Sequence, residues 1–169
     1  MRYVMKQRVL ALTDAFTIRD RHGKKVYRVK GRLAGVGDKL VIRDMDGKKV
    51  ATIRQKVVSS VPRYRIRRGG KLVAVINRKA FSPLRDRFKV RIKDGGPNVR
   101  IVGNIFDHEY RFLRQGQEIA RVSKKWVSVS DRYGVRVAKG EDDVLILACA
   151  AVIDLICHDE DIRPYQLEE

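Results

Sequence analysis

The segment 142–157 is almost entirely apolar, and it constrains the fold more than any other part of the chain. Between Val144 and Cys157 the single charged side chain is Asp154. A helix without a polar stripe must lie in lipid or be surrounded by protein. These 14 residues would form a helix of about 21 Å, whereas a membrane span needs about 20 apolar residues. We therefore expect a helix over 142–157 that is buried inside the rest of the protein.

The preceding residues repeat a hairpin pattern. Each copy has an alternating strand, a short turn with glycine and a second alternating strand, and the turn glycines are residues 23, 47, 70, 95 and 116. Glycine adopts the positive φ that tight hairpin turns require. We therefore assign a structural role to Gly23, Gly47 and Gly70. Alternation with a period of two places the apolar residues of each strand on one face.

The number of these strands predicts a barrel. A first strand near residues 3–9 and a final ribbon near 126–137 bring the count to about twelve. Consecutive hairpins form an antiparallel meander, and closing it removes its edges. A barrel of this size has room for more than side chains. We predict a mainly β fold, a closed antiparallel barrel enclosing a central hydrophobic C-terminal helix. It forms one domain over 1–158, followed by an acidic tail over 159–169.

The charge of the chain is large and unevenly distributed. Its net charge is +18, with 38 Lys and Arg against 20 Asp and Glu. Residues 1–140 contain 37 basic and 11 acidic side chains, whereas residues 141–169 contain one arginine and nine acids. The strand alternation places the basic side chains on the outside of the barrel. A field of this sign favours an anionic partner, either anionic phospholipid at a membrane surface or nucleic acid.

The densest basic run lies in the third hairpin and the loop that follows it. Arginine forks match the geometry of phosphate, and each basic residue near an anionic surface contributes about 1 kcal/mol. Alternatively, the alternation spreads these charges over solvated strands without a specific site. The candidate anion-binding residues are Arg63, Arg65, Arg67, Arg68, Arg78, Lys79, Arg85 and Arg87.

Few residues suggest catalysis or metal binding. His108 stands between Asp107 and Glu109, and on a strand it would point away from both. The mixed set at 157–161 follows the helix, where we expect a polar cap. No Ser-His-Asp or Cys-His constellation is recognisable. We expect no enzymatic activity, no cofactor and no metal.

Two aspartates of the C-terminal helix are assigned structural roles, Asp143 near its start and Asp154 within the apolar run. Asp154 requires a buried partner, and we expect an inward-facing arginine. Cys149 and Cys157 would lie about 12 Å apart along the helix axis, too far for a disulfide. Free buried thiols are typical of a reducing compartment. With no targeting signal recognised, we expect a cytoplasmic protein that associates peripherally with membrane.

Taken together in order, several short motifs resemble the LURP-one-related proteins over about residues 3 to 158. These motifs are Tyr3–Arg8, Phe16–Asp20 with Gly23, Val26–Gly31, Asp44 with Gly47, Pro62–Tyr64, and the helix from Asp143 to Asp154.

The resemblance implies a twelve-stranded barrel around a C-terminal helix, as in the tubby C-terminal domain and the phospholipid scramblases. Tubby-type domains bind phosphoinositide headgroups, so a non-enzymatic module that docks on anionic phospholipid is implied. The cysteine-rich and proline-rich segments of scramblases are not found, and scramblase activity is not expected. Nucleic-acid binding through the basic exterior is the alternative. Against it, the sequence offers no helix free to enter a groove and no clustered surface aromatics.

Overall fold

The computed structural model describes residues 1–6, 15–32, 37–56, 63–78, 88–128 and 132–162. These form twelve strands, one 3₁₀ helix and one α-helix. The strands are β1 (Arg2–Lys6), β2 (Ala15–Asp20), β3 (Lys25–Arg32), β4 (Lys39–Asp44), β5 (Lys49–Lys56), β6 (Arg63–Arg68), β7 (Lys71–Arg78), β8 (Phe88–Ile92), β9 (Val99–Asn104), β10 (Glu109–Arg114), β11 (Gln117–Ser123) and β12 (Arg132–Val137). The helices are η1 (Lys124–Trp126) and α1 (Asp143–Ile162).

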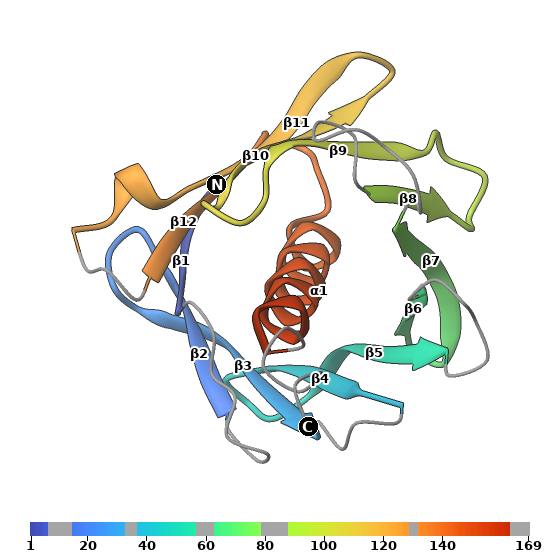
Figure 1. Ribbon diagram of the computed structural model, residues 1–169. Helices are drawn as coiled ribbons and strands as arrows, with labels where there is room; N and C mark the ends of the chain where they lie inside the picture. The colour runs from blue at the N-terminus through green and yellow to red at the C-terminus, as the bar shows by residue number, and fades with distance from the viewer. Residues whose placement is uncertain (7–14, 33–36, 57–62, 79–87, 129–131, 163–169) are drawn as a thin grey trace, which may run out of the picture.

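The strands form a closed antiparallel barrel. Each strand pairs with its neighbours in the chain, and β1 pairs with β12 to close the cylinder, with Tyr3 opposite Val135. Helix α1 runs through the middle of this cylinder, with strands on every side (Figure 1). The predicted closed barrel around a C-terminal helix is confirmed.

Helix α1 and the inward faces of the strands make one core. Every residue from Val144 to Ile156 is buried except Asp154, which is half-buried. Inward-facing residues of the strands, such as Ile42 and Phe112, are fully buried. The helix begins at Asp143 and continues past the expected end at Cys157 as far as Ile162. Residues 159–162, which we expected to start an acidic tail, therefore belong to α1.

Two of the hairpin turns share one hydrogen-bonding pattern. Asp20 Oδ1 accepts from the backbone N–H of His22 at 2.8 Å and of Lys24 at 3.0 Å. Asp44 Oδ1 accepts in the same way from Asp46 at 3.1 Å and Lys48 at 2.8 Å. The glycines that complete these turns, at positions 23 and 47, have φ of 80° and 86°. This left-handed conformation is the one that glycine adopts without steric cost.

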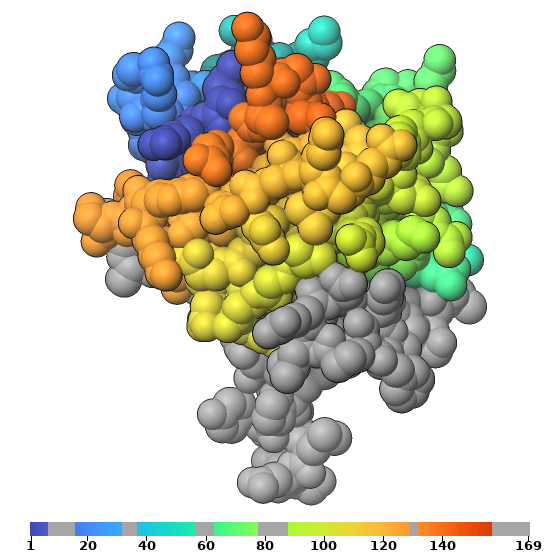
Figure 2. Space-filling view, turned by 90° about the horizontal axis from the view of Figure 1, so that it is seen from above, coloured from blue at the N-terminus to red at the C-terminus, as the bar shows by residue number. Residues whose placement is uncertain are grey.

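Because the strands alternate in direction, their connections alternate between the two ends of the barrel. We call the end with the short turns 21–24, 45–48 and 69–70 the turn end, and the end with residues 105–108 and η1 the loop end. The turn end is at the top of Figure 2, where the first residues and the first hairpin appear in blue. Helix α1 enters at the turn end and extends toward the loop end. Within the described residues, no helix has both the length and the apolar character needed to span a membrane.

Candidate functional site

The outer face of β4, β5 and β6 places basic side chains directly opposite one another. Lys39 of β4 pairs with Arg54 of β5, and Arg54 pairs with Arg65 of β6. Neighbouring strands are about 4.8 Å apart, so these three cations form a row across the sheet. The row faces outward because the alternate residues, such as Ile53 and Ile66, fill the core.

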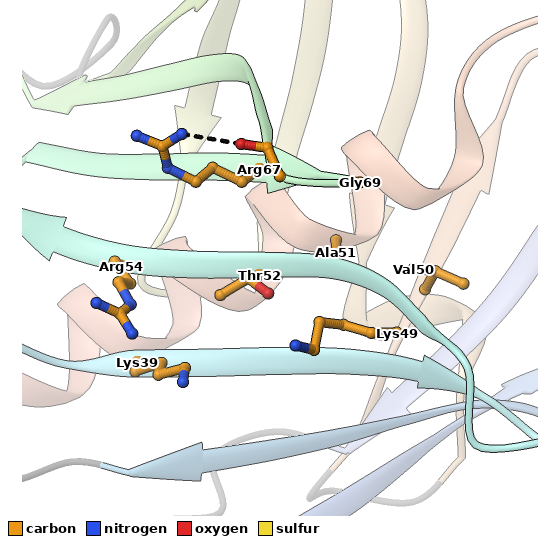
Figure 3. Close-up of a pocket in the computed structure, with 9 residues that line it drawn as sticks. Lys39, Lys49, Val50, Ala51, Thr52, Arg54, Arg67 and Gly69 are labelled. Atoms are coloured by element: carbon orange, nitrogen blue, oxygen red, sulfur yellow. Dashed lines mark hydrogen bonds between the residues drawn. The ribbon is translucent and has the colours of Figure 1, made fainter.

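A surface depression of about 500 Å³ lies beside this row. We call it the basic groove, and Figure 3 shows its lining. Arg67 is held in place there by a hydrogen bond from its Nη1 to the carbonyl oxygen of Gly70, at 3.0 Å. The groove is lined by Lys39, Lys49, Val50, Ala51, Thr52, Arg54, Arg67, Gly69 and Gly70.

The three cations of the row have no carboxylate neighbour among the described residues. In the part of the chain that the structure describes, Lys39, Arg54 and Arg65 form no ion pair. Like charges directly opposite each other on a sheet are destabilising. An arrangement that costs folding energy and leaves ammonium and guanidinium groups exposed is suited to an anionic ligand.

The structure brings together only part of the predicted anion-binding set. Arg63, Arg65 and Arg67 are exposed on the outer face of β6. Arg68 instead donates to Asp142, just before α1. Arg78 is the last residue of β7, and Lys79, Arg85 and Arg87 lie outside the described residues.

Sequence reasoning missed Lys39, Lys49 and Arg54, because they belong to a different hairpin from the dense basic run. All three residues lie in the second hairpin, Lys39 before its turn and Lys49 and Arg54 after it. The pairing of β4 with β5 passes through a bulge between Ile42 and Arg43 and places Lys39 opposite Arg54.

Acidic residues at the start of α1 attach the helix to the rim of the turn end. Asp142 Oδ1 accepts from the N–H of Leu145 at 3.0 Å and so caps the helix. Arg114 pairs with Glu141 at 2.7 Å. Burial, together with a hydrogen bond to Asp143, raises the pKa of Tyr3. These contacts place Arg68 in the attachment of the helix and outside the basic groove.

Asp154 of α1 has a buried histidine as a partner. His108 Nε2 lies 2.9 Å from Asp154 Oδ1. The prediction that His108 lies on a strand is wrong. It ends the turn between β9 and β10 with φ of 53°, so its ring points into the barrel. Among the described side chains, no group of three His, Cys, Asp or Glu could hold a metal. The side chains of 157–161 lie outside that set.

Two aromatic side chains are partly exposed near the loop end, Trp126 at 41% and Phe106 at 40%. Trp126 lies over Gly134, where a Cβ atom would come within 3.1 Å of the indole. The guanidinium carbon of Arg136 lies 5.4 Å from the centre of the indole ring, at cation–π distance.

The sequence and the fold of this chain are similar to those of known proteins. The family model of the LURP-one-related proteins matches residues 1–154. The uncharacterized protein YxjI of Bacillus subtilis (strain 168) is 35% identical over 159 residues, which cover 93% of this chain and 94% of that protein. The X-ray structure of an Arabidopsis thaliana protein has the same fold, with a TM-score of 0.67 at 20% identity, covering 92% of this chain and 91% of that one. The closed barrel, the enclosed helix and the family match agree, and the chain belongs to the LURP-one-related family.

Proposed function

We propose that this protein is a non-enzymatic binding module that docks on anionic phospholipid at the cytoplasmic surface of a membrane. The contact surface is the basic groove with the adjoining Arg63 and Arg65. The observation that carries the proposal is the row of Lys39, Arg54 and Arg65. These cations are in register across three strands and have no carboxylate partner in the part of the chain that the structure describes.

The chemistry of the groove suits a phosphorylated headgroup. Guanidinium groups bind phosphate oxygens through paired hydrogen bonds, and Thr52 adds a hydroxyl between Arg54 and Lys49 (Figure 3). The volume of about 500 Å³ is within the range of small-ligand sites. The resemblance to tubby-type domains favours phosphoinositide-like headgroups as the preferred lipid.

A co-sedimentation experiment tests this proposal. The protein is mixed with vesicles of phosphatidylcholine alone, or of phosphatidylcholine with phosphatidylserine or with a phosphoinositide. We expect sedimentation with the anionic vesicles, weakening as salt screens the charges, and none with phosphatidylcholine alone. Gel shifts with single-stranded RNA and duplex DNA are run in the same buffers. Tighter binding to nucleic acid than to anionic vesicles would contradict the proposal and favour the nucleic-acid alternative.

A further inference from the structure

A second basic depression lies at the turn end, separate from the basic groove. It has a volume of about 880 Å³ and lies where the start of the chain, the first hairpin and the end of β12 come together. Figure 2 shows these segments in dark blue, light blue and orange at the top of the molecule. We call it the turn-end pocket, and its lining is Met1, Arg2, Asp20, Arg21, His22, Arg136 and Val137. We propose that the turn-end pocket binds a small phosphate ester.

Two of its arginines are placed side by side by the closure of the barrel. Arg2 of β1 is directly opposite Arg136 of β12. The pairing extends one residue further, because the N–H of Val137 donates to the carbonyl oxygen of Met1 at 2.7 Å. Arg136 is oriented by the indole of Trp126 and by Glu118, whose Oε1 is 3.4 Å from its Nη2. Arg2 is exposed and forms no ion pair with any described residue.

The first hairpin contributes Arg21 and His22 to the same pocket. Arg21 Nε donates to His22 Nε2 at 2.8 Å, so each side chain restricts the other. A neutral imidazole that accepts at Nε2 carries its proton on Nδ1, which leaves that N–H free to donate. The terminal nitrogens of Arg21 also remain as donors.

Asp20 is the one carboxylate among the described residues of the lining, and it accepts hydrogen bonds within the turn. Its Oδ1 accepts from the N–H groups of His22 and Lys24. Arg136 is paired with Glu118, so Arg2, Arg21 and His22 are the donors that remain for a ligand beside Asp20. This excess of oriented donors is suited to a dianion, and arginine forks match phosphate in particular.

The second hairpin provides an internal comparison. Its turn repeats the aspartate contacts of the first, yet it has Met45 and Asp46 where the first has Arg21 and His22. The turn geometry therefore does not require a basic pair at these positions. Their presence only in the turn that borders Arg2 and Arg136 points to a ligand.

The size and walls of the pocket indicate the class of ligand. A volume of about 880 Å³ exceeds what an inorganic phosphate fills and lies within the range of small-molecule sites. The side chain of Met1, 68% exposed, supplies an apolar wall. A phosphate ester with a compact apolar group uses both the donors and this wall.

Calorimetric titration with phenyl phosphate and with inorganic phosphate tests the inference. We expect saturable binding of phenyl phosphate, weaker binding of inorganic phosphate, and NMR shifts of the Nε–H signals of Arg2, Arg21 and Arg136. The double variant Arg21→Met/His22→Asp copies the residues of the second turn, so we expect it to fold. This variant should bind phenyl phosphate about tenfold or more weakly, because losing a hydrogen bond to a charged group reduces affinity by about that factor. Arg2→Gln should weaken binding similarly.

Lys48→Glu is the control, because it makes the same charge change in the second hairpin outside the pocket. It should retain the affinity of the unmodified protein for phenyl phosphate. If Lys48→Glu and the double variant lost the same affinity for phenyl phosphate, only the net charge of the protein would matter. That result, unchanged affinity in the double variant, or no saturable binding to the unmodified protein would each overturn the inference.

Discussion

His108 Nε2 lies 2.9 Å from Asp154 Oδ1, and this contact ties the turn between β9 and β10 to the enclosed helix. Both side chains are largely withdrawn from solvent, with 4% and 13% exposed. The His108 ring also packs against Tyr133 of β12 in a tilted arrangement, with 4.5 Å between ring centres. The charged residue within the apolar run of α1 thus has a defined partner on the barrel wall.

We expect His108→Ala to destabilise the protein by about 1.5–3 kcal/mol, because a buried hydrogen bond to a carboxylate is lost. Chemical denaturation measures this change. The control is His22→Ala, at an exposed position, which should stay within about 0.5 kcal/mol. A cycle with Asp154→Asn should show coupling between the two residues. Additive effects would mean that the contact contributes nothing.

Gly103 and Gly47 provide a second prediction, because both have positive φ but differ in their surroundings. At Gly47 nothing lies within 4 Å of an added Cβ, so Gly47→Ala should cost only the conformational term of about 1–2 kcal/mol. At Gly103 an added Cβ would lie 2.5 Å from the carbonyl oxygen of Glu109. Gly103→Ala should therefore destabilise the protein more than Gly47→Ala does, and thermal unfolding of the two variants measures the difference. The reverse order would contradict the packing of β9 against β10.

The sequence predicted the overall fold because its two signals are local. Alternation around turn glycines such as Gly47 identifies hairpins, and the apolar run from Val144 identifies a buried helix. The site was predicted less well because it depends on register between strands. Arg65 and Arg67 were found within one dense run, whereas Arg54 becomes their neighbour only through pairing.

Turn geometry accounts for the error at His108. The residues 105–108 form a turn and not a strand, and a single histidine with positive φ reverses the side-chain direction that alternation predicts. The turn-end pocket was also beyond sequence reasoning. It unites residues 2, 21 and 136, which come together only when the barrel closes.

The stability of the protein should fall at alkaline pH. Burial raises the pKa of the Cys149 thiol above its ordinary value of 9.0, and the pKa of Tyr3 is raised above 10.0. The native state keeps both protons where the unfolded chain loses them, so unfolding becomes more favourable as the pH rises through 9.0 and 10.0.

Urea denaturation between neutral pH and pH of about 10.5 checks this. Cys149→Ala should remove the part of the decline that sets in near the ordinary thiol pKa. Tyr3→Phe should reduce the part that sets in at higher pH, to which Tyr27 also contributes because burial raises its pKa. If stability falls equally with pH in both variants and in the parent, groups other than Cys149 and Tyr3 cause the fall.

The row of like charges should cost folding energy that salt recovers. We expect Arg54→Gln to stabilise the protein by about 0.2–1 kcal/mol at low salt, because it relieves repulsion from Lys39 and Arg65. The gain should shrink as salt screens the charges. Thermal unfolding across a salt series measures it, with Lys125→Gln on the exposed η1 helix as the control. A gain that persists unchanged at high salt would exclude electrostatic repulsion as its cause.

The most direct test of the docking proposal compares two double variants of equal charge for binding to phosphoinositide-containing vesicles. Arg54→Gln/Arg65→Gln removes two of the three cations of the row at the basic groove. Lys124→Gln/Lys125→Gln removes two cations from η1, near the loop end. The proposal predicts that the first loses about 2 kcal/mol of vesicle binding, at about 1 kcal/mol per basic residue, while the second remains close to the parent. Equal loss in both variants would contradict a defined docking face and reduce binding to the overall charge of the protein.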